Sequence, residues 1–298
     1  AWPPATITWV NPFPAGGGTD VFARPLAAQV AEQLGCQIII DNKGGAGGTV
    51  GASQAAKMKP DGSVFFVGAI HHTIAPSIYK TLDYDLEKDF VPVGRFASAF
   101  YIILAHPKVG VKTLKELIAK AKAEPGKLAY ATSGAGSSNH LLGAQLEQVI
   151  GAALVHIPYR GAGPAMVDTI AGNVPSMFDS LPSAAPHIKA GKLRALAVTG
   201  SKRSKAMPDV PTISEFYPGF ENTIWIGLFA PKGTPEAIVS KLRSEVSKSL
   251  KSSALIDAFA KAGGIEPFMT TPEEMKQLIQ HDQVKYSKII RDLKIKLD

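Results

Sequence analysis

The sequence predicts an α/β protein of two lobes with a ligand cleft between them, and three observations carry this prediction. Short apolar runs alternate with helical patterns over the first two thirds of the 298 residues, which is typical of strands joined by crossover helices. Two segments far apart in the chain share one plan of strand, glycine-rich loop and helix. The last third of the chain is more helical.

The expected strands are short buried runs bounded by glycine, proline or polar residues, at 7–10, 38–40, 64–67, 101–105, 128–131, 193–198 and 226–230. Between them, the spacing of apolar side chains predicts helices at 21–34, 113–123, 139–150 and 162–171. Two further helices, at 235–250 and 272–290, follow the start signals Gly-Thr-Pro and Thr-Thr. This alternation predicts mostly parallel sheets.

The two matching segments are ITWVNPFPAGGGTDVFA, from residue 7, and LAYATSGAGSSNHLLGA, from residue 128. The simplest arrangement gives each segment to a separate lobe. In open α/β sheets, ligands bind where the carboxyl ends of strands meet the starts of helices. Two such loops facing each other would form a cleft.

Both loops suit an anion. Glycines let the backbone approach a ligand closely, and free amides at a helix start favour negative charge. The hydroxyls of Thr19, Ser137 and Ser138 are expected to add donors. Asp20 either caps its helix or contacts the ligand. Ordinary strand-to-helix connections with caps are the alternative explanation of both loops.

The anion is expected to be smaller than a nucleotide. A third glycine-rich stretch, at 41–52, also runs from strand to helix, but the G-x-G-x-x-G pattern fails there because its last position is Val50. In the 133–138 loop the same position is Asn139, and no G-x-x-x-x-G-K-[ST] motif occurs. A carboxylate fits these loops best.

Composition excludes several classes of protein. The content of 45% hydrophobic and 19% charged residues is typical of a soluble globular protein, and no apolar run reaches the ~18 residues of a membrane span. The net charge of +7 comes from scattered Lys and Arg, which favours an anionic small molecule over nucleic acid. The first residues lack the pattern of a signal peptide, as expected of a processed N-terminus or a trimmed chain. The single Cys36 cannot form an internal disulfide.

No catalytic or metal-binding motif appears locally. The seven histidines form no H-E-x-x-H, and no G-x-S-x-G is present. The pair His71 and His72 follows a buried strand, so one of them either faces the cleft or belongs to a polar loop. His140 lies among apolar neighbours in a helix and is expected to be structural.

The combination and order of five motifs resembles the solute receptors of tripartite tricarboxylate transporters, also called Bug-type receptors. The motifs are NPFPAGGGTDVFAR, DNKGGAGGTVGA, YATSGAGSSNHL, HIPYRGAGPAMVDTIAGNVPSMFD and MPDVPTISE. The resemblance implies a two-lobed periplasmic binding protein (a type II Venus flytrap), with lobe 1 at 1–103 plus 221–298 and lobe 2 at 104–220. It also implies that a small organic carboxylate, often a dicarboxylate, is held in the cleft. No catalysis, metal or cofactor is expected.

The resemblance also implies the site residues and partners. The family's binding loops fall on residues 13–20 and 133–138, its histidine on His72, its acid on Asp179 and a late aromatic on Trp225. His71 departs from the small residue or hydroxyl that members often carry there. The predicted ligand-binding residues are Phe13, Gly16, Gly17, Thr19, Asp20, His71, His72, Ser133, Ser137, Ser138 and Asp179. The expected protein is a periplasmic monomer whose signal peptide has been removed, with membrane transporter subunits as partners and no nucleic acid.

One alternative stays open from the sequence. An α/β enzyme that acts on a small carboxylate would use Asp179 or His72 as its acid or base. The absence of a local nucleophile or metal motif favours the receptor.

Overall fold

The computed structural model describes residues 1–16, 18–265 and 267–294. The contacts between residues group the chain into two compact units. Unit 1 comprises Ala1–Ser98 and Ile224–Lys288, and unit 2 comprises Ala99–Thr223 together with the end of the C-terminal helix from Ile289. The chain therefore passes from unit 1 to unit 2 and back. The lobe boundaries at 103/104 and 220/221 stay a prediction.

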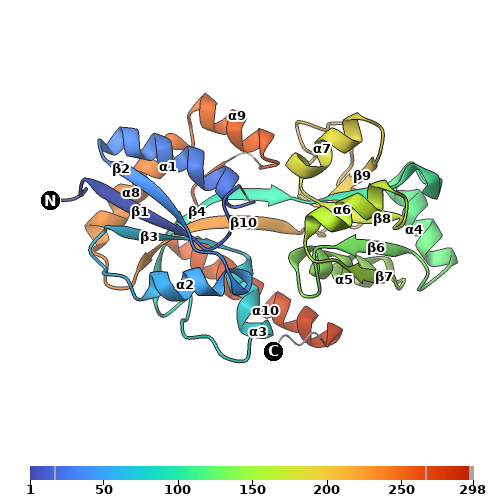
Figure 1. Cartoon of the computed structure of the whole chain (residues 1–298), viewed down its shortest axis with the longest axis horizontal. Coiled ribbons are helices and arrows are strands. Elements are labelled where there is room, and N and C mark those ends of the chain that lie inside the picture. Colours follow the sequence, from blue (N-terminus) through green and yellow to red (C-terminus); the bar gives the residue numbers. More distant parts are fainter. Residues whose placement is uncertain (17, 266, 295–298) are drawn as a thin grey trace. The chain divides into compact units, whose positions relative to one another are not determined.

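Unit 1 holds a five-stranded sheet in the order β2-β1-β3-β10-β4, built from β1 (Thr6–Asn11), β2 (Gln37–Asn42), β3 (Val64–Ala69), β4 (Phe90–Phe100) and β10 (Thr223–Pro231). Strand β1 pairs in parallel with β2 and β3, whereas β10 pairs antiparallel with β3. Its other elements are α1 (Asp20–Leu34), η1 (Ala46–Gly48), α2 (Thr49–Ala56), α3 (His71–Ile78), α8 (Glu236–Ser249), α9 (Ser253–Lys261) and α10 (Pro272–Leu293). Helix α1 packs with α8 and α9 on one face of the sheet, and α2 lies on the other face (Figure 1).

Unit 2 holds a second five-stranded sheet in the order β7-β6-β8-β5-β9, built from β5 (Ile102–Ala105), β6 (Ala129–Thr132), β7 (Val155–Pro158), β8 (Ser176–Asp179) and β9 (Arg194–Val198). Strand β6 is parallel to β7 and β8, and β5 is antiparallel to β8 and β9. Its other elements are η2 (Pro107–Val109), α4 (Leu114–Ala123), α5 (Ser138–Ile150), α6 (Ala162–Ile170), α7 (Leu181–Lys189) and η3 (Ile213–Glu215). Both sheets are mixed, which revises the expectation of mostly parallel sheets.

Each unit has its own apolar core. In unit 1 the rings of Phe66 and Phe90 stack with centroids 5.0 Å apart, and Trp9 is fully buried. In unit 2 Tyr130 stacks on Phe178 with centroids 4.9 Å apart. Because each core fixes the carboxyl ends of its own strands, it also fixes the loop that follows β1 in unit 1 and the loop that follows β6 in unit 2.

All the predicted strands and helices are confirmed to within three residues at each end. The sequence reading expected a helix after the 41–52 stretch, which is α2, but gave no bounds for it. It missed β4, β7, α3, α7 and α9. Strand β4 contains Pro92 and Gly94, residues that normally interrupt a strand. Helix α3 contains Pro76. Among the described residues, none of the helices combines the length and apolar character that crossing a membrane requires.

Candidate functional site

The first candidate loop joins the end of β1 at Asn11 to the start of α1 at Asp20. Asp20 determines its shape, because the buried carboxylate accepts the Gly16 amide at 2.9 Å and two hydrogen bonds of 3.0 Å from Arg24. Side-chain amides of Asn11, at 3.3 Å, and Asn42, at 3.2 Å, also donate to it. Asp20 thus organises the loop from inside.

The electrostatics agree with this role for Asp20. Burial alone would raise the pKa of its carboxyl. The hydrogen bonds from Arg24, Gly16 and Asn42 outweigh that effect and lower the pKa below its ordinary value. The carboxylate is therefore ionised at neutral pH and has its donors already. These contacts give Asp20 a structural role within the loop, and its contact with the ligand stays a prediction.

Thr19 is also committed within the loop. It is buried, and its hydroxyl donates to the Asn11 side-chain oxygen at 2.9 Å. A hydroxyl has a single proton to donate, and Thr19 donates it within the loop. Contact of Thr19 with the ligand stays a prediction. The amides of Ala15, Gly18 and Thr19 have no hydrogen-bond partner among the described residues. Gly17, also predicted to bind ligand, lies outside them.

Phe13 packs beside two histidines that follow β3. Its ring centroid lies 4.7 Å from that of His71 and 5.9 Å from that of His72. Gly48, at φ +92°, lies against the same rings, and a Cβ there would come within 2.9 Å of Phe13 and 3.0 Å of His72. The glycine-rich stretch at 41–52 therefore supports the first loop through close packing that a larger residue would prevent.

His72 is fully buried and uses both ring nitrogens on the backbone. The Ala69 amide donates to Nδ1 at 3.0 Å, so Nδ1 is unprotonated and Nε2 carries the proton. Nε2 then donates to the Gly48 carbonyl at 3.1 Å. Burial lowers the pKa of His72 to about 4, although the two backbone bonds oppose the shift. This neutral imidazole ties α3 to Gly48, which removes it as the acid or base of the enzyme alternative.

His71 differs from its neighbour. The residue is partly accessible, yet its Nδ1 is buried and has no hydrogen-bond partner in the described part of the chain. Burial and the adjacent His72 lower the pKa of His71 to about 4. A neutral imidazole with an unsatisfied nitrogen beside Phe13 is available to a ligand group, so of the two histidines His71 is the better candidate for contact.

The second candidate loop joins β6 to α5. Ser137 is the N-cap of α5, and its hydroxyl accepts the His140 amide at 3.3 Å while it donates to the Gly134 carbonyl at 2.6 Å. Ser133 donates to the Asn139 side-chain oxygen at 3.2 Å. As with Thr19, the hydroxyl proton of Ser137 is used within the loop. The expected role of Ser137 as a ligand donor stays a prediction.

Backbone amides remain as the donors of this loop. Those of Ala135, Ser138 and Asn139 make no hydrogen bond to any described residue. Ser138 and Asn139 are the first two residues of the 13-residue helix α5, where the helix dipole favours negative charge, and Ala135 lies in the loop just before its N-cap. Unpaired amides in this arrangement favour a negatively charged group.

Asp179 and Tyr101 lie at the same end of the sheet, since Asp179 ends β8 and pairs with Ile102 of β5. The Tyr101 hydroxyl is hydrogen-bonded to Ser138, and burial raises the pKa of Tyr101 to about 12. Asp179 is buried, and its Oδ2 has no hydrogen-bond partner among the described residues. Burial raises the pKa of its carboxyl. An unsatisfied acid beside the loop suits a ligand that brings its own hydrogen-bond donor.

Trp225, the late aromatic that the family resemblance implies, is a core residue. It is 1% exposed, and its indole N–H donates to Asp282 at 2.7 Å. Sequence reasoning missed the side chains that shape the loops, namely Asn11, Arg24, Asn42, Tyr101, Asn139 and His156. A sequence signal existed only for Arg24, four residues after Asp20 on the same helix face.

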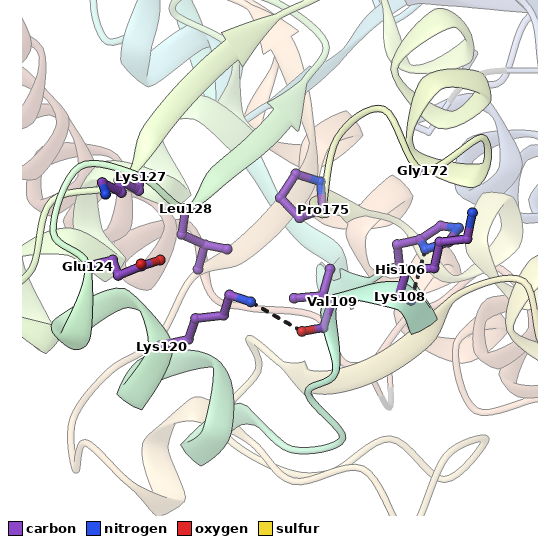
Figure 2. Close-up of a pocket in the computed structure, with 9 residues that line it drawn as sticks. All are labelled: His106, Lys108, Val109, Lys120, Glu124, Lys127, Leu128, Gly172 and Pro175. Carbon is purple, nitrogen blue, oxygen red and sulfur yellow. Dashed lines mark hydrogen bonds between the residues drawn. The ribbon is translucent and has the colours of Figure 1, made fainter.

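A separate cavity of about 320 Å³ lies at the opposite end of the unit 2 sheet (Figure 2). His106, Lys108, Lys120 and Lys127 give it a basic lining, and Lys120 donates to the Val109 carbonyl at 3.2 Å. Its lysines are exposed, so it lacks the preorganised donors found at the start of α5. No group of three or more metal-ligating side chains occurs within the described ranges.

Comparison with known proteins agrees with this architecture. Residues 22–295 match the tripartite tricarboxylate transporter family receptor. The periplasmic binding protein BugD is 34% identical with a TM-score of 0.81, over 99% of this chain and all of its own. Rpa4515 of R. palustris, solved with adipate, is 32% identical with a TM-score of 0.86 over all of both chains. MatC of Rhodopseudomonas palustris, solved with bound malate, is 34% identical with a TM-score of 0.78, over 96% of this chain and 98% of its own.

The family match spans most of the chain, and these structures resemble it over at least 96% of its length. Their fold is the α/β fold of two lobes that this chain has. The chain therefore belongs to the receptor family of the tripartite tricarboxylate transporters and has the two-lobed fold of periplasmic binding proteins.

Proposed function

We propose that this protein is a periplasmic receptor that captures a small organic dicarboxylate and delivers it to a membrane transporter. The observation that carries the proposal is the set of unpaired amides at Ala135, Ser138 and Asn139, at the start of α5. Amides at a helix start favour a carboxylate through the dipole by ~0.3–1 kcal/mol. Each charge-assisted hydrogen bond adds roughly 1.5–3 kcal/mol.

The first loop supports the same chemistry from unit 1. Its amides at Ala15, Gly18 and Thr19 lack partners among the described residues, and Asp20 and Asn11 hold the loop in shape. The amides of each loop, taken by itself, suit a carboxylate group. The ligands of two relatives, adipate and malate, are both dicarboxylates. The family's transporter supplies the expected membrane partner.

Ser138→Pro tests the proposal because it removes one N–H where proline is tolerated. Ser138 is the first residue of α5, a position that proline favours. The preceding Ser137 has φ −68° and ψ 161°, the extended conformation that a following proline requires. Helix α5 is therefore expected to form in the variant, which lacks the backbone N–H donor of residue 138.

Two matched variants complete the experiment. Ser138→Ala removes the hydroxyl but keeps the amide, and Ser253→Pro places proline at the first residue of α9, after an extended N-cap. Affinity is measured by calorimetry with whichever acid of a panel including adipate and malate stabilises the wild type. We expect Ser138→Pro to bind at least tenfold more weakly than Ser138→Ala, and Ser253→Pro to bind like the wild type. Equal binding by Ser138→Pro and Ser138→Ala would contradict the proposal.

A further inference from the structure

His140 lies in the first turn of α5 and contacts the loop that precedes it. The Gly136 amide donates to its Nδ1 at 3.0 Å. Because an N–H can only donate, Nδ1 must be unprotonated, so the neutral ring carries its proton on Nε2. One glycine of the loop is thereby held by an imidazole in a defined tautomer.

His156 holds the neighbouring glycine through one intermediate. This residue lies on β7, opposite Tyr130 of β6, and its Nε2 is hydrogen-bonded to the Thr132 hydroxyl. That hydroxyl oxygen lies 3.3 Å from both the amide nitrogen and the carbonyl oxygen of Gly134. The last residue of β6 therefore joins the second imidazole to the loop.

The two imidazoles stack on each other. Their centroids are 3.7 Å apart and their planes differ by 11°. Two stacked cations at this separation would repel each other, so the contact favours the neutral form of both rings. Burial lowers the pKa of both, that of His156 to about 4.

We propose that His140 and His156 act as a pair of positioning residues that hold Gly134 and Gly136 in place, so that the unpaired amides of the 133–138 loop converge on an anion. The expected effect on ligand affinity rests on the proposed function. The expected effect on the conformation of the loop does not. Neither histidine is required to touch the ligand. Their effect is to reduce the number of conformations that the loop must lose when it binds.

Two substitutions test separately the two contributions of His140, which are its hydrogen-bond acceptor and its aromatic ring. His140→Phe keeps an aromatic ring for stacking but removes the acceptor, whereas the side-chain oxygen of His140→Asn stands where Nδ1 was. His106→Phe is the matched control, since His106 Nδ1 also accepts a backbone amide, that of Lys108 at 3.1 Å. That bond lies at the other end of the unit 2 sheet.

The readouts are amide hydrogen exchange of Gly136 in the ligand-free protein and the affinity for the acid selected from the panel. We expect His140→Phe to speed Gly136 exchange at least tenfold and to weaken binding at least fivefold. In His140→Asn, the Gly136 exchange rate and the affinity should both be close to those of the wild type. His106→Phe should change neither the exchange rate nor the affinity. Unchanged Gly136 exchange in His140→Phe would overturn the proposal, even if the protein binds no carboxylate.

A measurement on the unmodified protein guards against a variant that fails to fold. Nitrogen chemical shifts of the imidazoles distinguish the two tautomers directly. We expect His140 to be neutral at pH 7 with its proton on Nε2. A proton on Nδ1 would overturn the proposal, because that nitrogen could not accept the Gly136 amide.

Discussion

Replacing Asp20 by alanine should destabilise unit 1 strongly, because this carboxylate organises the loop after β1. The Gly16 amide and the Asn42 side chain are each expected to contribute about 1.5 kcal/mol to the free energy of unfolding, as donors to a buried charge. Arg24 is 52% exposed, so its ion pair adds at most about 1 kcal/mol. We expect the free energy of unfolding of Asp20→Ala to fall by about 3 to 4 kcal/mol.

The assay is urea denaturation of the ligand-free protein, with Asp83→Ala as the control. The carboxylate of Asp83 also forms an ion pair, with its Oδ2 2.9 Å from the Lys57 Nζ. Both of these side chains, however, are 65% exposed. The control should show no measurable change in the free energy of unfolding. If Asp20→Ala is no less stable than Asp83→Ala, the organising role of Asp20 is refuted.

The pH dependence gives a second signature of the same perturbation. The pKa of Asp20 is lower in the folded protein than its ordinary value of 3.8. A lowered carboxyl pKa stabilises the folded state above the ordinary value, and this contribution is lost as the pH falls through the folded pKa. The stability difference between the wild type and Asp20→Ala should therefore shrink below pH 3.8.

Three further predictions concern other parts of the site. In urea denaturation, Gly48→Ala should lower the free energy of unfolding by about 1 to 3 kcal/mol more than Gly151→Ala does. Both glycines have positive φ, but of the two only Gly48 lacks space for a Cβ. Equal losses of stability in the two variants would contradict this prediction. Ser137→Ala and Ser252→Ala each remove a helix N-cap, so each should cost about 0.5–2 kcal/mol, while calorimetry should show weaker carboxylate binding only for Ser137→Ala. Burial lowers the pKa of His72 from 6.5 to about 4, so the imidazole binds a proton more tightly in the unfolded chain than in the folded protein. The free energy of unfolding should therefore decrease as the pH falls from 6.5 toward 4, by up to about 3 kcal/mol. His72→Gln should lose less stability over that range, and a slope as steep as that of the wild type would contradict the assignment.

The sequence predicted features that depend on local pattern. Both glycine-rich loops lie where the motifs placed them, because glycines between an apolar strand and a helical pattern restrict the backbone locally. The N-cap that Ser137 forms has the same local origin, and caps were the alternative explanation of both loops. Family resemblance added Asp179, whose buried oxygen lies at the end of β8.

Interactions between distant segments could not be predicted in this way. The Asp20 network needs Asn42, which strand pairing between β1 and β2 brings next to the loop. The stacked rings of His140 and His156 depend on the register of β6 with β7. The internal acceptors of the Thr19 and Ser137 hydroxyls, Asn11 and the Gly134 carbonyl, could not be predicted from the sequence either.

The most direct test of the central claim is amide NMR of the protein with a bound acid. The claim is that backbone amides at the start of α5 hold a carboxylate. On saturation with the acid selected from the panel, the amide protons of Ala135, Ser138 and Asn139 should shift downfield as they gain charge-assisted hydrogen bonds. The diamide of the same compound should bind far more weakly and shift them little. Binding of the acid that leaves these three amides unchanged, or equal binding of the neutral diamide, would contradict the account.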